Sequence, residues 1–353
     1  MIYIIIILLI GYLCYNSIVE QFSYRLCKKR NVFGLNKVVL NKNKINRTDK
    51  NDWNLYLPCG YKFVEKEITN LPVDSNNTHI FGISGSDNIA SKNNLWKILR
   101  DYYGVTEASE IMPITYILQD SEDMLSFNKT YSNNKTYILK KNIQRKEGLK
   151  LVKGNIKEIL DSKKEDYKIV QEYIKNPFLV NGYKLNIRLF MLIVCNGNHK
   201  RIYVHKSGKC LYTLKKYKAN MDFHSNITSY NADKNIYNSN PLSLEQLRMY
   251  LIQNKHNDIQ VFESIRSIMS KLATAIKNHV CNKACLNNVT AFQLFGVDVI
   301  LDDKMNPKVL EINKGPNMRY VNKEDMELKE NVYEDVYKNV NIIESEFNGF
   351  EEV

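Results

Sequence analysis

Two acidic residues and an amide near the C-terminal end of the sequence have the spacing of a metal site. Residues 292–301 and 308–312 are mostly apolar, as buried strands are, and a short polar segment joins them. In a regular antiparallel hairpin, Asp298 and Glu311 are equally far from the turn and face each other, with about 5 Å between their Cβ atoms. Asn313 lies two residues beyond Glu311, on the same face. Carboxylate and amide oxygens are the ligands that Mg²⁺ prefers, so we predict these three residues as metal ligands; the alternative is a surface hairpin with incidental acids.

Basic and polar side chains alternate with aliphatic ones along residues 183–195. A strand with this alternation presents Lys184, Asn186 and Arg188 on one face. Lysine and arginine directed into a cleft bind phosphate oxygens, and arginine does so with two parallel hydrogen bonds. Lys140, which ends a shorter predicted strand before a polar loop, is a further candidate. An ordinary half-exposed strand shows the same alternation, so this pattern alone leaves both interpretations open.

Several common catalytic motifs are missing from the sequence. It contains no GxxxxGK[ST] phosphate loop, no GxGxxG after a strand and no HExxH. Residues 82–86 approach the GxSxG pattern of a nucleophile elbow but end in serine. The six histidines show no ligand spacing. These observations disfavour zinc hydrolases and serine hydrolases.

Strands and helices are interleaved along the chain, mostly with the strands in hairpin-like pairs. This order predicts an α+β fold with mainly antiparallel sheets and flanking helices, in preference to a doubly wound parallel sheet. Ser243 and Gln246 form a capping box that opens one helix, Gly104 ends another, and the basic segment 37–50 is predicted to be a solvated connector. The predicted helices are 91–104, 106–112, one that begins at 243, and 259–280, and the predicted strands are 136–140, 167–173, 183–195, 201–206, 292–301 and 308–312.

The first residues differ in composition from the rest of the chain. Residues 2–15 contain no charge, and basic residues follow at 28–30. We therefore predict a single-pass membrane anchor over residues 1–22, and the positive-inside rule places the remaining chain in the cytoplasm. A cleavable signal peptide and a buried first helix are the alternatives.

The chain of 353 residues carries 50 Lys and Arg against 38 Asp and Glu, a net charge of +12 that should attract polyanions. A hydrophobic fraction of 44% excludes a disordered or collagen-like chain, and the length allows one large or two to three closely packed domains. The seven cysteines form no CxxC pair, so we expect reduced, mostly buried thiols, and a metal site is the alternative. Six N-x-S/T sequons, at Asn46, Asn76, Asn128, Asn134, Asn226 and Asn288, are expected by coincidence in so asparagine-rich a chain, and glycosylation is the alternative.

Taken in order, several segments between about residues 92 and 320 resemble the tubulin–tyrosine ligase family of the ATP-grasp superfamily. No one of them is decisive, but six occur in the family's order, and the last two have its spacing. The segments are 108–116, 137–140, 171–174, 181–188, 227–230 and 292–298 with 310–313.

The resemblance implies an ATP-grasp fold that uses ATP and Mg²⁺ to join a free amino acid to a protein carboxylate through an acyl-phosphate. It implies an N-terminal subdomain with a connector at 23–115, a central subdomain at 116–175 and a C-terminal subdomain at 176–345 that holds the Mg/ATP site. Tubulin or another protein with an acidic tail is the implied acceptor, and basic side chains would steer such a tail toward the cleft. No nucleic acid is expected, since only the charge suggests it and no nucleic-acid motif accompanies that charge.

The resemblance also assigns roles to individual residues. Arg188 and Glu311 match catalytic positions, Glu311 also belongs to the metal set with Asp298 and Asn313, and Tyr230 adjoins the amino-acid site. The positions that match nucleotide-binding residues are Lys140, Lys146, Gln171, Glu172, Tyr173, Ile174, Lys184, Asn186, Thr228 and Ser229.

Three departures from the family pattern affect the acceptor side more than the metal side. Asn186 replaces the usual aspartate, Gly148 is the one glycine of a loop that usually has two, and Leu211 replaces an arginine expected to bind the carboxylate of the incoming amino acid. Lys206 or Lys209 are the candidates to replace that arginine. The departures motivate an alternative function, a catalytically impaired module that binds ATP and acidic protein tails.

Overall fold

The computed structural model describes residues 22–27, 34–71, 78–143, 148–228, 234–283, 286 and 289–353. The predicted membrane anchor at residues 1–22 lies outside the described residues, apart from Phe22. Within these ranges, no helix combines the length and the apolar character that crossing a membrane requires.

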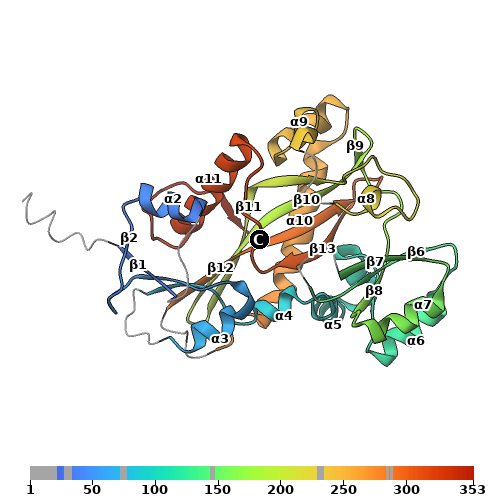
Figure 1. Cartoon of the computed structure of the whole chain (residues 1–353), viewed down its shortest axis with the longest axis horizontal. Helices are drawn as coiled ribbons and strands as arrows, with labels where there is room; N and C mark the ends of the chain where they lie inside the picture. Colours follow the sequence, from blue (N-terminus) through green and yellow to red (C-terminus); the bar gives the residue numbers. More distant parts are fainter. Residues whose placement is uncertain are drawn as a thin grey trace, which may run out of the picture.

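A ten-stranded mixed sheet forms the larger part of the molecule (Figure 1). Its centre is antiparallel, with β10 (Tyr183–Asn196) between β11 (His199–Tyr212) and β12 (Thr290–Leu301). Three further strands extend this region: β9 (Leu179–Val180) pairs with β10, β13 (Pro307–Asn313) with β12, and β14 (Phe350–Glu352) with β11. On the other side of β12 the strands are parallel, in the order β4 (His79–Phe81), β3 (Leu55–Leu57), β1 (Ser23–Leu26) and β2 (Asn46–Arg47).

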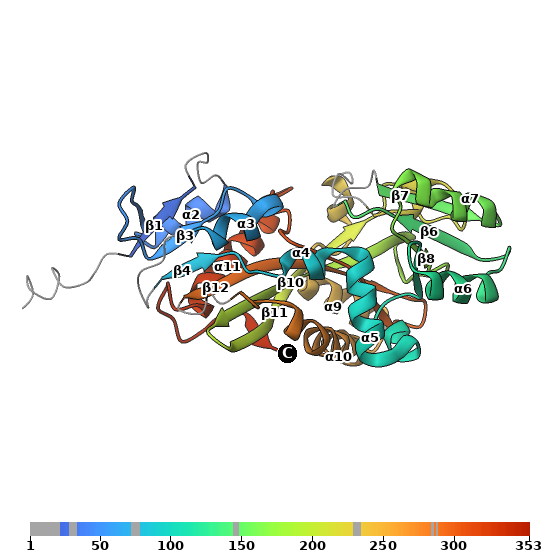
Figure 2. The same ribbon diagram turned by 90° about the horizontal axis from the view of Figure 1, so that it is seen from below.

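A separate four-stranded antiparallel sheet lies at the opposite end of the molecule from β1 to β4 (Figure 2). Its order is β5 (Thr115–Ile117), β8 (Ile169–Glu172), β6 (Thr136–Lys140) and β7 (Leu149–Lys153). Helices α6 (Ser121–Thr130) and α7 (Ile156–Asp161) contribute Phe127 and Ile159 to a hydrophobic core of its own.

Alternate side chains of β10 point to opposite faces of the sheet, so this one strand contributes to two hydrophobic cores and to a cavity. Odd-numbered residues such as Ile187 and Met191 pack into a core with α5 (Lys92–Ile111), α9 (Leu244–Gln253) and α10 (Asp258–Ile276). The even-numbered Phe190 and Leu192 face a second core with α2 (Leu35–Lys42) and α11 (Lys323–Asn339). Further along the same even face, apolar residues give way to Lys184, Asn186 and Arg188. The remaining helices are α3 (Val64–Thr69), α4 (Ser86–Ala90) and α8 (Phe223–Asn226), with 3₁₀ turns η1 (Tyr61–Phe63), η3 (Ser162–Glu165), η4 (Lys234–Asn238) and η5 (Lys277–His279).

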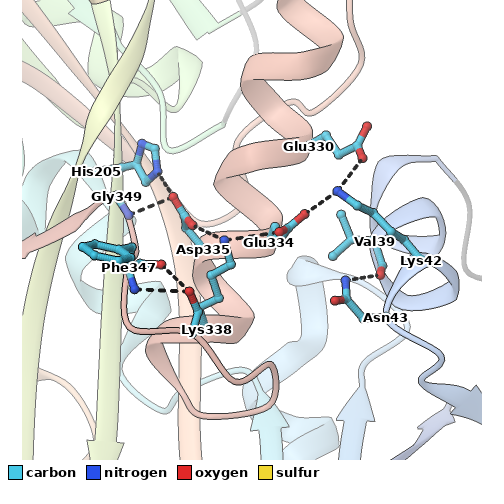
Figure 3. Close-up of polar contacts among 11 residues, drawn as sticks. Val39, Lys42, Asn43, His205, Glu330, Glu334, Asp335, Lys338, Phe347 and Gly349 are labelled. Carbon is cyan, nitrogen blue, oxygen red and sulfur yellow. Dashed lines mark hydrogen bonds and ion pairs between the residues drawn. The ribbon is translucent and has the colours of Figure 1, made fainter.

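Charged side chains of helix α11 connect it to α2, to β11 and to the segment before β14 (Figure 3). Glu334 accepts from Lys42 of α2 at 2.8 Å. Asp335 contacts His205 Nε2 of β11 at 3.0 Å and accepts from the backbone N–H of Gly349 at 2.8 Å. Lys338 lies between the two carboxylates, at 3.2 Å and 3.3 Å. The half-buried Asp335 therefore ties the segment before β14 to the helix.

Most predicted elements are present, and the capping box of Ser243 and Gln246 is complete. Gly104, with φ of 77°, interrupts α5 where a helix end is predicted. The prediction of a solvated connector at 37–50 is wrong, because α2 and β2 lie there and Val39, Leu40 and Ile45 are buried. The strands of the predicted segments 23–115 and 176–345 share one sheet, and the proposed domain boundaries stay a prediction.

The expectation of reduced cysteines is also wrong for four of them. Cys27 and Cys59 form a disulfide, and so do Cys195 and Cys281. Their partners lie 32 and 86 residues apart in sequence, so only the folded topology brings them together. Cys27 follows β1 and Cys59 follows β3, which are neighbouring strands.

Candidate active site

A cavity of about 480 Å³ lies between the small sheet and the large one. Strands β6 and β8 supply one wall, β10 another, and the β12–β13 hairpin a third. Its volume falls in the range of small-molecule sites. The predicted residues that line it are Lys140, Gln171, Glu172, Ile174, Lys184, Asn186, Arg188, Thr228, Asp298, Glu311 and Asn313.

The hairpin presents its three oxygen-bearing side chains to this cavity. Asp298 and Glu311 are register partners, as the count from the turn predicts, and Asn313 lies opposite Gly296. The pairing is not regular, however, because a bulge next to Asp298 leaves Leu310 without a partner in the ladder. Asn313 Nδ2 lies 3.3 Å from Glu311 Oε1. The three side chains therefore converge at one place.

Each of the two acids contacts a cation, the half-buried Arg188 or the buried Lys92. Arg188 donates from Nε to Asp298 Oδ1 at 2.5 Å and from Nη2 to Oδ2 at 3.0 Å, across the β10–β12 ladder. Lys92 Nζ lies 3.2 Å from Glu311 Oε2. Burial alone would raise the pKa of Glu311, but Lys92, Lys140 and Arg188 outweigh it and lower the pKa to about 2. Glu311 is therefore ionised at neutral pH.

Two buried lysines lie between the sheets, and burial lowers the pKa of both. Burial lowers the pKa of Lys140 to about 8, against the opposing charge of Glu311. Burial and the neighbouring Lys140 lower the pKa of Lys184 to about 7. Lys184 Nζ donates to Tyr173 Oη at 2.9 Å and lies over that ring, and Lys140 Nζ lies 3.4 Å from the carbonyl oxygen of Leu310. An anion bound here would restore both ammonium groups to their charged form.

Not every residue of the predicted nucleotide-binding segment 171–174 lines the cavity. Gln171, Glu172 and Ile174 line the cavity. Gln171 Nε2 donates to Thr115 Oγ1 at 2.7 Å, and Glu172 pairs with Lys135 at 2.6 Å. Tyr173 instead directs its hydroxyl to Asn226 Oδ1 at 2.9 Å. Its side chain thus supports Lys184 from behind.

Asn186 has an unused acceptor in the cavity wall. Its Nδ2 donates to Thr228 Oγ1 at 2.9 Å, while its buried Oδ1 has no hydrogen-bond partner among the described residues. Leu211 is its register partner on β11 and also lines the cavity. Lys146, Ser229 and Tyr230 lie outside the described residues.

Three lysines of the cavity were not assigned from the residues themselves. Lys92, the first residue of α5, is buried with its Nζ 3.0 Å from the carbonyl oxygen of Ile143. A lysine in the first turn of a helix opposes the helix dipole, and this unfavourable placement is the signal that the sequence offered. Lys209 and Lys329 flank the buried Asp325 at 2.5 Å and 3.0 Å, and both line the cavity. Of the two candidates to replace the family arginine, Lys209 is therefore the one in place, while Lys206 is exposed.

Comparisons with known proteins agree with this architecture. The model of the tubulin-tyrosine ligase family matches residues 74–348. Human tubulin polyglutamylase TTLL6 is 26% identical over 241 residues, which is 61% of this chain and 26% of the human protein. The mouse TTLL6 polyglutamylase is 24% identical over 83% of this chain and 37% of its own length, and the mouse monoglutamylase TTLL4 is 26% identical over 71% of this chain and 22% of its own. The chain thus spans well under half the length of these relatives.

The matched region contains the small sheet, the strands β4 and β9 to β13 of the large sheet, and the residues that line the cavity, from Lys92 on α5 to Lys329 on α11. The chain belongs to the tubulin-tyrosine ligase family.

Proposed function

We propose that the chain is an ATP-dependent carboxylate–amine ligase that adds an amino acid to a protein carboxylate. The observation that carries this proposal is the meeting of Asp298, Glu311 and Asn313 with Lys140, Lys184 and Arg188 in one cavity between two sheets. An oxygen donor set beside buried cations suits a metal-bound polyphosphate, since each part offsets charge on the other.

The residues fit magnesium. Glu311 is ionised, Asn313 offers an amide oxygen, and Asp298 faces the same point. In the free chain Arg188 and Lys92 hold the two acids, so Mg²⁺ brought in with ATP would compete with these cations while the phosphates attract them. When bound, Mg²⁺ would offset the charge of the β- and γ-phosphates.

The remaining wall fits the nucleotide. Lys140 and Lys184 would bind phosphate oxygens, the buried Oδ1 of Asn186 would accept from a ribose hydroxyl or an ordered water, and the backbone of residues 171–174 would meet the adenine. Lys146, Ser229 and Tyr230 keep their predicted roles in this proposal.

The proposed reaction has two steps. A carboxylate oxygen of the acceptor protein attacks the γ-phosphorus of ATP, and ADP leaves. The amine of the free amino acid then attacks the carbonyl carbon of the acyl-phosphate, an amide bond forms, and inorganic phosphate leaves with the proton lost by the amine. Arg188 would stabilise the negative charge that develops on the transferred group.

Lys209 is proposed to bind the carboxylate of the incoming amino acid in place of the family arginine. The acceptor is proposed to be tubulin or another protein with an acidic tail, which the net charge of +12 would attract. The curated relatives are named as tubulin glutamylases, so tubulin is the first acceptor to assay and glutamate the first amino acid. Attachment to a membrane through residues 1–22 stays part of the proposal.

The test is incorporation of labelled Glu, Tyr or Gly into tubulin by the purified full-length chain with MgATP. Glu311→Ala should reduce incorporation about 100-fold or more, and Asp303→Asn, at an exposed acid of the adjoining turn, should leave it unchanged. A folded protein that binds MgATP and incorporates none of the three, with tubulin or with acidic peptides as acceptor, contradicts the ligase.

A second function has specific support from Asn186 and Leu211. Without the usual aspartate and arginine, the chain would be a binding module that holds MgATP and acidic tails without turnover. Saturable MgATP binding with no release of ADP or phosphate in the presence of every acceptor would favour it.

A further inference from the structure

Two disulfides each link segments that are far apart in the sequence. Cys27–Cys59 links the end of β1 to the segment after β3, with 5.2 Å between the Cα atoms. Cys195–Cys281 links the far end of β10 to the segment after η5, with 6.4 Å between the Cα atoms. Both separations lie in the range that a disulfide requires. Two cross-links at unrelated places are harder to explain as chance contacts than one.

The remaining described cysteine is protected from pairing. Cys210 lies on β11 with no exposed surface, and burial raises the pKa of its thiol to about 12. A thiol with this pKa forms almost no thiolate, which is the reactive species. By contrast, the exposed Cys59 and the half-buried Cys281 are both paired. Each cysteine that solvent can reach in the described ranges is thus in a disulfide.

We infer that the folded part of this chain matures in an oxidising, secretory-type lumen, and not in the cytoplasm. Disulfides persist in such compartments and are reduced in the cytosol. For each bond, two thiols lose two electrons and two protons to the disulfide of a protein thiol–disulfide oxidoreductase, which becomes a dithiol. The inference reverses the orientation that the basic residues at 28–30 suggest.

The inference goes beyond the proposed function and leaves the ligase chemistry unchanged. The cavity residues and both disulfides lie in different places, and none of the described cysteines lines the cavity. It does narrow the acceptor: the physiological acceptor would be an acidic protein tail of the same compartment, and tubulin would serve as a surrogate in the assay.

The sequons provide an independent reporter of compartment. Asn46 lies on the edge strand β2 and Asn134 in a turn before β6, and both are exposed. Asn226 has an exposed fraction of 1%, and its Nδ2 donates to the carbonyl oxygens of Asp222 at 2.7 Å and Lys218 at 3.1 Å. In a lumen, oligosaccharide is transferred from a lipid pyrophosphate to the amide nitrogen of Asn, which loses a proton as the pyrophosphate leaves. Asn46 and Asn134 should be modified, and Asn226 should stay unmodified in folded molecules.

A metal site is the competing explanation for one cysteine pair. Ligand atoms of Cys27, Cys59 and Glu67 lie within 4.8 Å of one another. Glu67, however, already accepts from the backbone N–H of Cys59 at 3.0 Å and from Tyr56 Oη at 2.7 Å. A bound metal would need both thiolates free, so the two explanations exclude each other.

The test uses the full-length chain produced in human cells, quenched with acid, alkylated and digested without reduction. Mass spectrometry should find peptides joined through Cys27–Cys59 and Cys195–Cys281, with Cys210 alkylated after unfolding. A glycosidase-sensitive mass should be present and should fall in the Asn46→Gln and Asn134→Gln variants, with unmodified Asn226 as the internal control.

Three results would overturn the inference. They are alkylation of Cys27, Cys59, Cys195 and Cys281 in the quenched cells, zinc bound to Cys27 and Cys59 in native mass spectrometry, and the absence of any glycosidase-sensitive mass. All three readouts are covalent or compositional and need no ligase activity. A failed incorporation assay therefore leaves this inference standing, and reduced cysteines leave the proposed ligase standing.

Discussion

At the scale of single residues, the free cavity contains lysines whose charge is poorly compensated. Lys140 and Lys184 lose part of their charge on burial, while Glu311 keeps its own because three cations surround it. This arrangement favours the binding of a polyanion, because the negative charge of the ligand would neutralise the lysines that the protein itself does not neutralise.

Binding of MgATP should take up protons. The lowered pKa values mean that Lys184 is mostly neutral and Lys140 about half neutral at pH 8, and phosphate oxygens would raise both pKa values again. Roughly one proton or more per MgATP should be absorbed at pH 8 and close to none at pH 6, with affinity falling as pH rises above 8. Calorimetry in two buffers of different ionisation enthalpy measures this number.

Lys184→Met is the matched variant for that measurement and should lower the uptake at pH 8 to about half a proton, the share of Lys140. An uptake that does not depend on pH, or that Lys184→Met leaves unchanged, would contradict the role of these lysines as phosphate ligands.

Lys209→Met should raise the KM for the amino acid about 10- to 100-fold with little change in the KM for ATP, because one charge-assisted hydrogen bond to a carboxylate is lost. Lys206→Met, on the exposed neighbour, should leave both constants unchanged, and Lys209→Arg should restore part of the loss. Equal changes in both KM values would instead indicate that Lys209 stabilises the cavity through Asp325.

At this scale local periodicity was enough to predict that Asp298 faces Glu311 and that the β10 cations share one face, while the roles of these residues stay predictions. It could not predict the pairing of Arg188 with Asp298, which needs the register of two strands 110 residues apart. The contact of Lys209 with Asp325 was equally hidden, because the two residues are 116 positions apart in the sequence.

At the scale of elements, the β12–β13 hairpin has the predicted pairing of Asp298 with Glu311 but not the regular ladder that the prediction assumed. Counting symmetrically from the turn assumes a regular ladder, whereas the register shifts by one residue at Leu310. The strands next to the turn are paired one residue away from the symmetric count, and the bulge at Leu310 shifts the pairing back by one residue. Asp298 therefore still faces Glu311. Bulges often occur beside active sites, and this one presents the carbonyl oxygen of Leu310 to Lys140.

Gly104→Ala should lower the free energy of unfolding by about 1–3 kcal/mol through backbone strain alone. Gly104 has φ of 77° and ψ of 165°, and a Cβ added there would meet nothing within 4 Å. Gly60→Ala is the control, because Gly60 has equally open surroundings but an extended φ of 166°. Urea denaturation compares the two variants, and equal losses would exclude backbone strain as the cause.

At the scale of the whole molecule, contacts far apart in sequence decide the architecture. The strands β4 and β12 pair although about 200 residues separate them, and β4 has three residues, too few to show a pattern. The helix α2 escaped prediction for a related reason: only tertiary contact with α11 explains why a basic segment buries Val39 and Leu40. The sequence therefore predicted two strands of the small sheet, β6 and β8, and the central strands of the large sheet, but not the N-terminal strands.

Loss of the two disulfides should cost different amounts of stability. Loop entropy gives about 4 kcal/mol for the 32-residue separation of Cys27–Cys59 and about 5 kcal/mol for the 86 residues of Cys195–Cys281, as upper bounds. Replacing Cys195 and Cys281 by serine should thus destabilise the chain by about 1 kcal/mol more than replacing Cys27 and Cys59. Urea titrations of the two double variants measure the difference, and the opposite order would contradict the loop-entropy explanation.

The long sequence separation between β4 and β12 also determines when the two strands can pair during translation. At roughly 5–20 residues per second, β4 leaves the ribosome some 10–40 s before its partner exists. During that interval the small sheet can close on its own core, and Cys27 can already meet Cys59, whereas the open edge of β4 has nothing to pair with. A nascent chain of this protein is therefore most in need of a chaperone in the middle of its translation, when its ends are still apart.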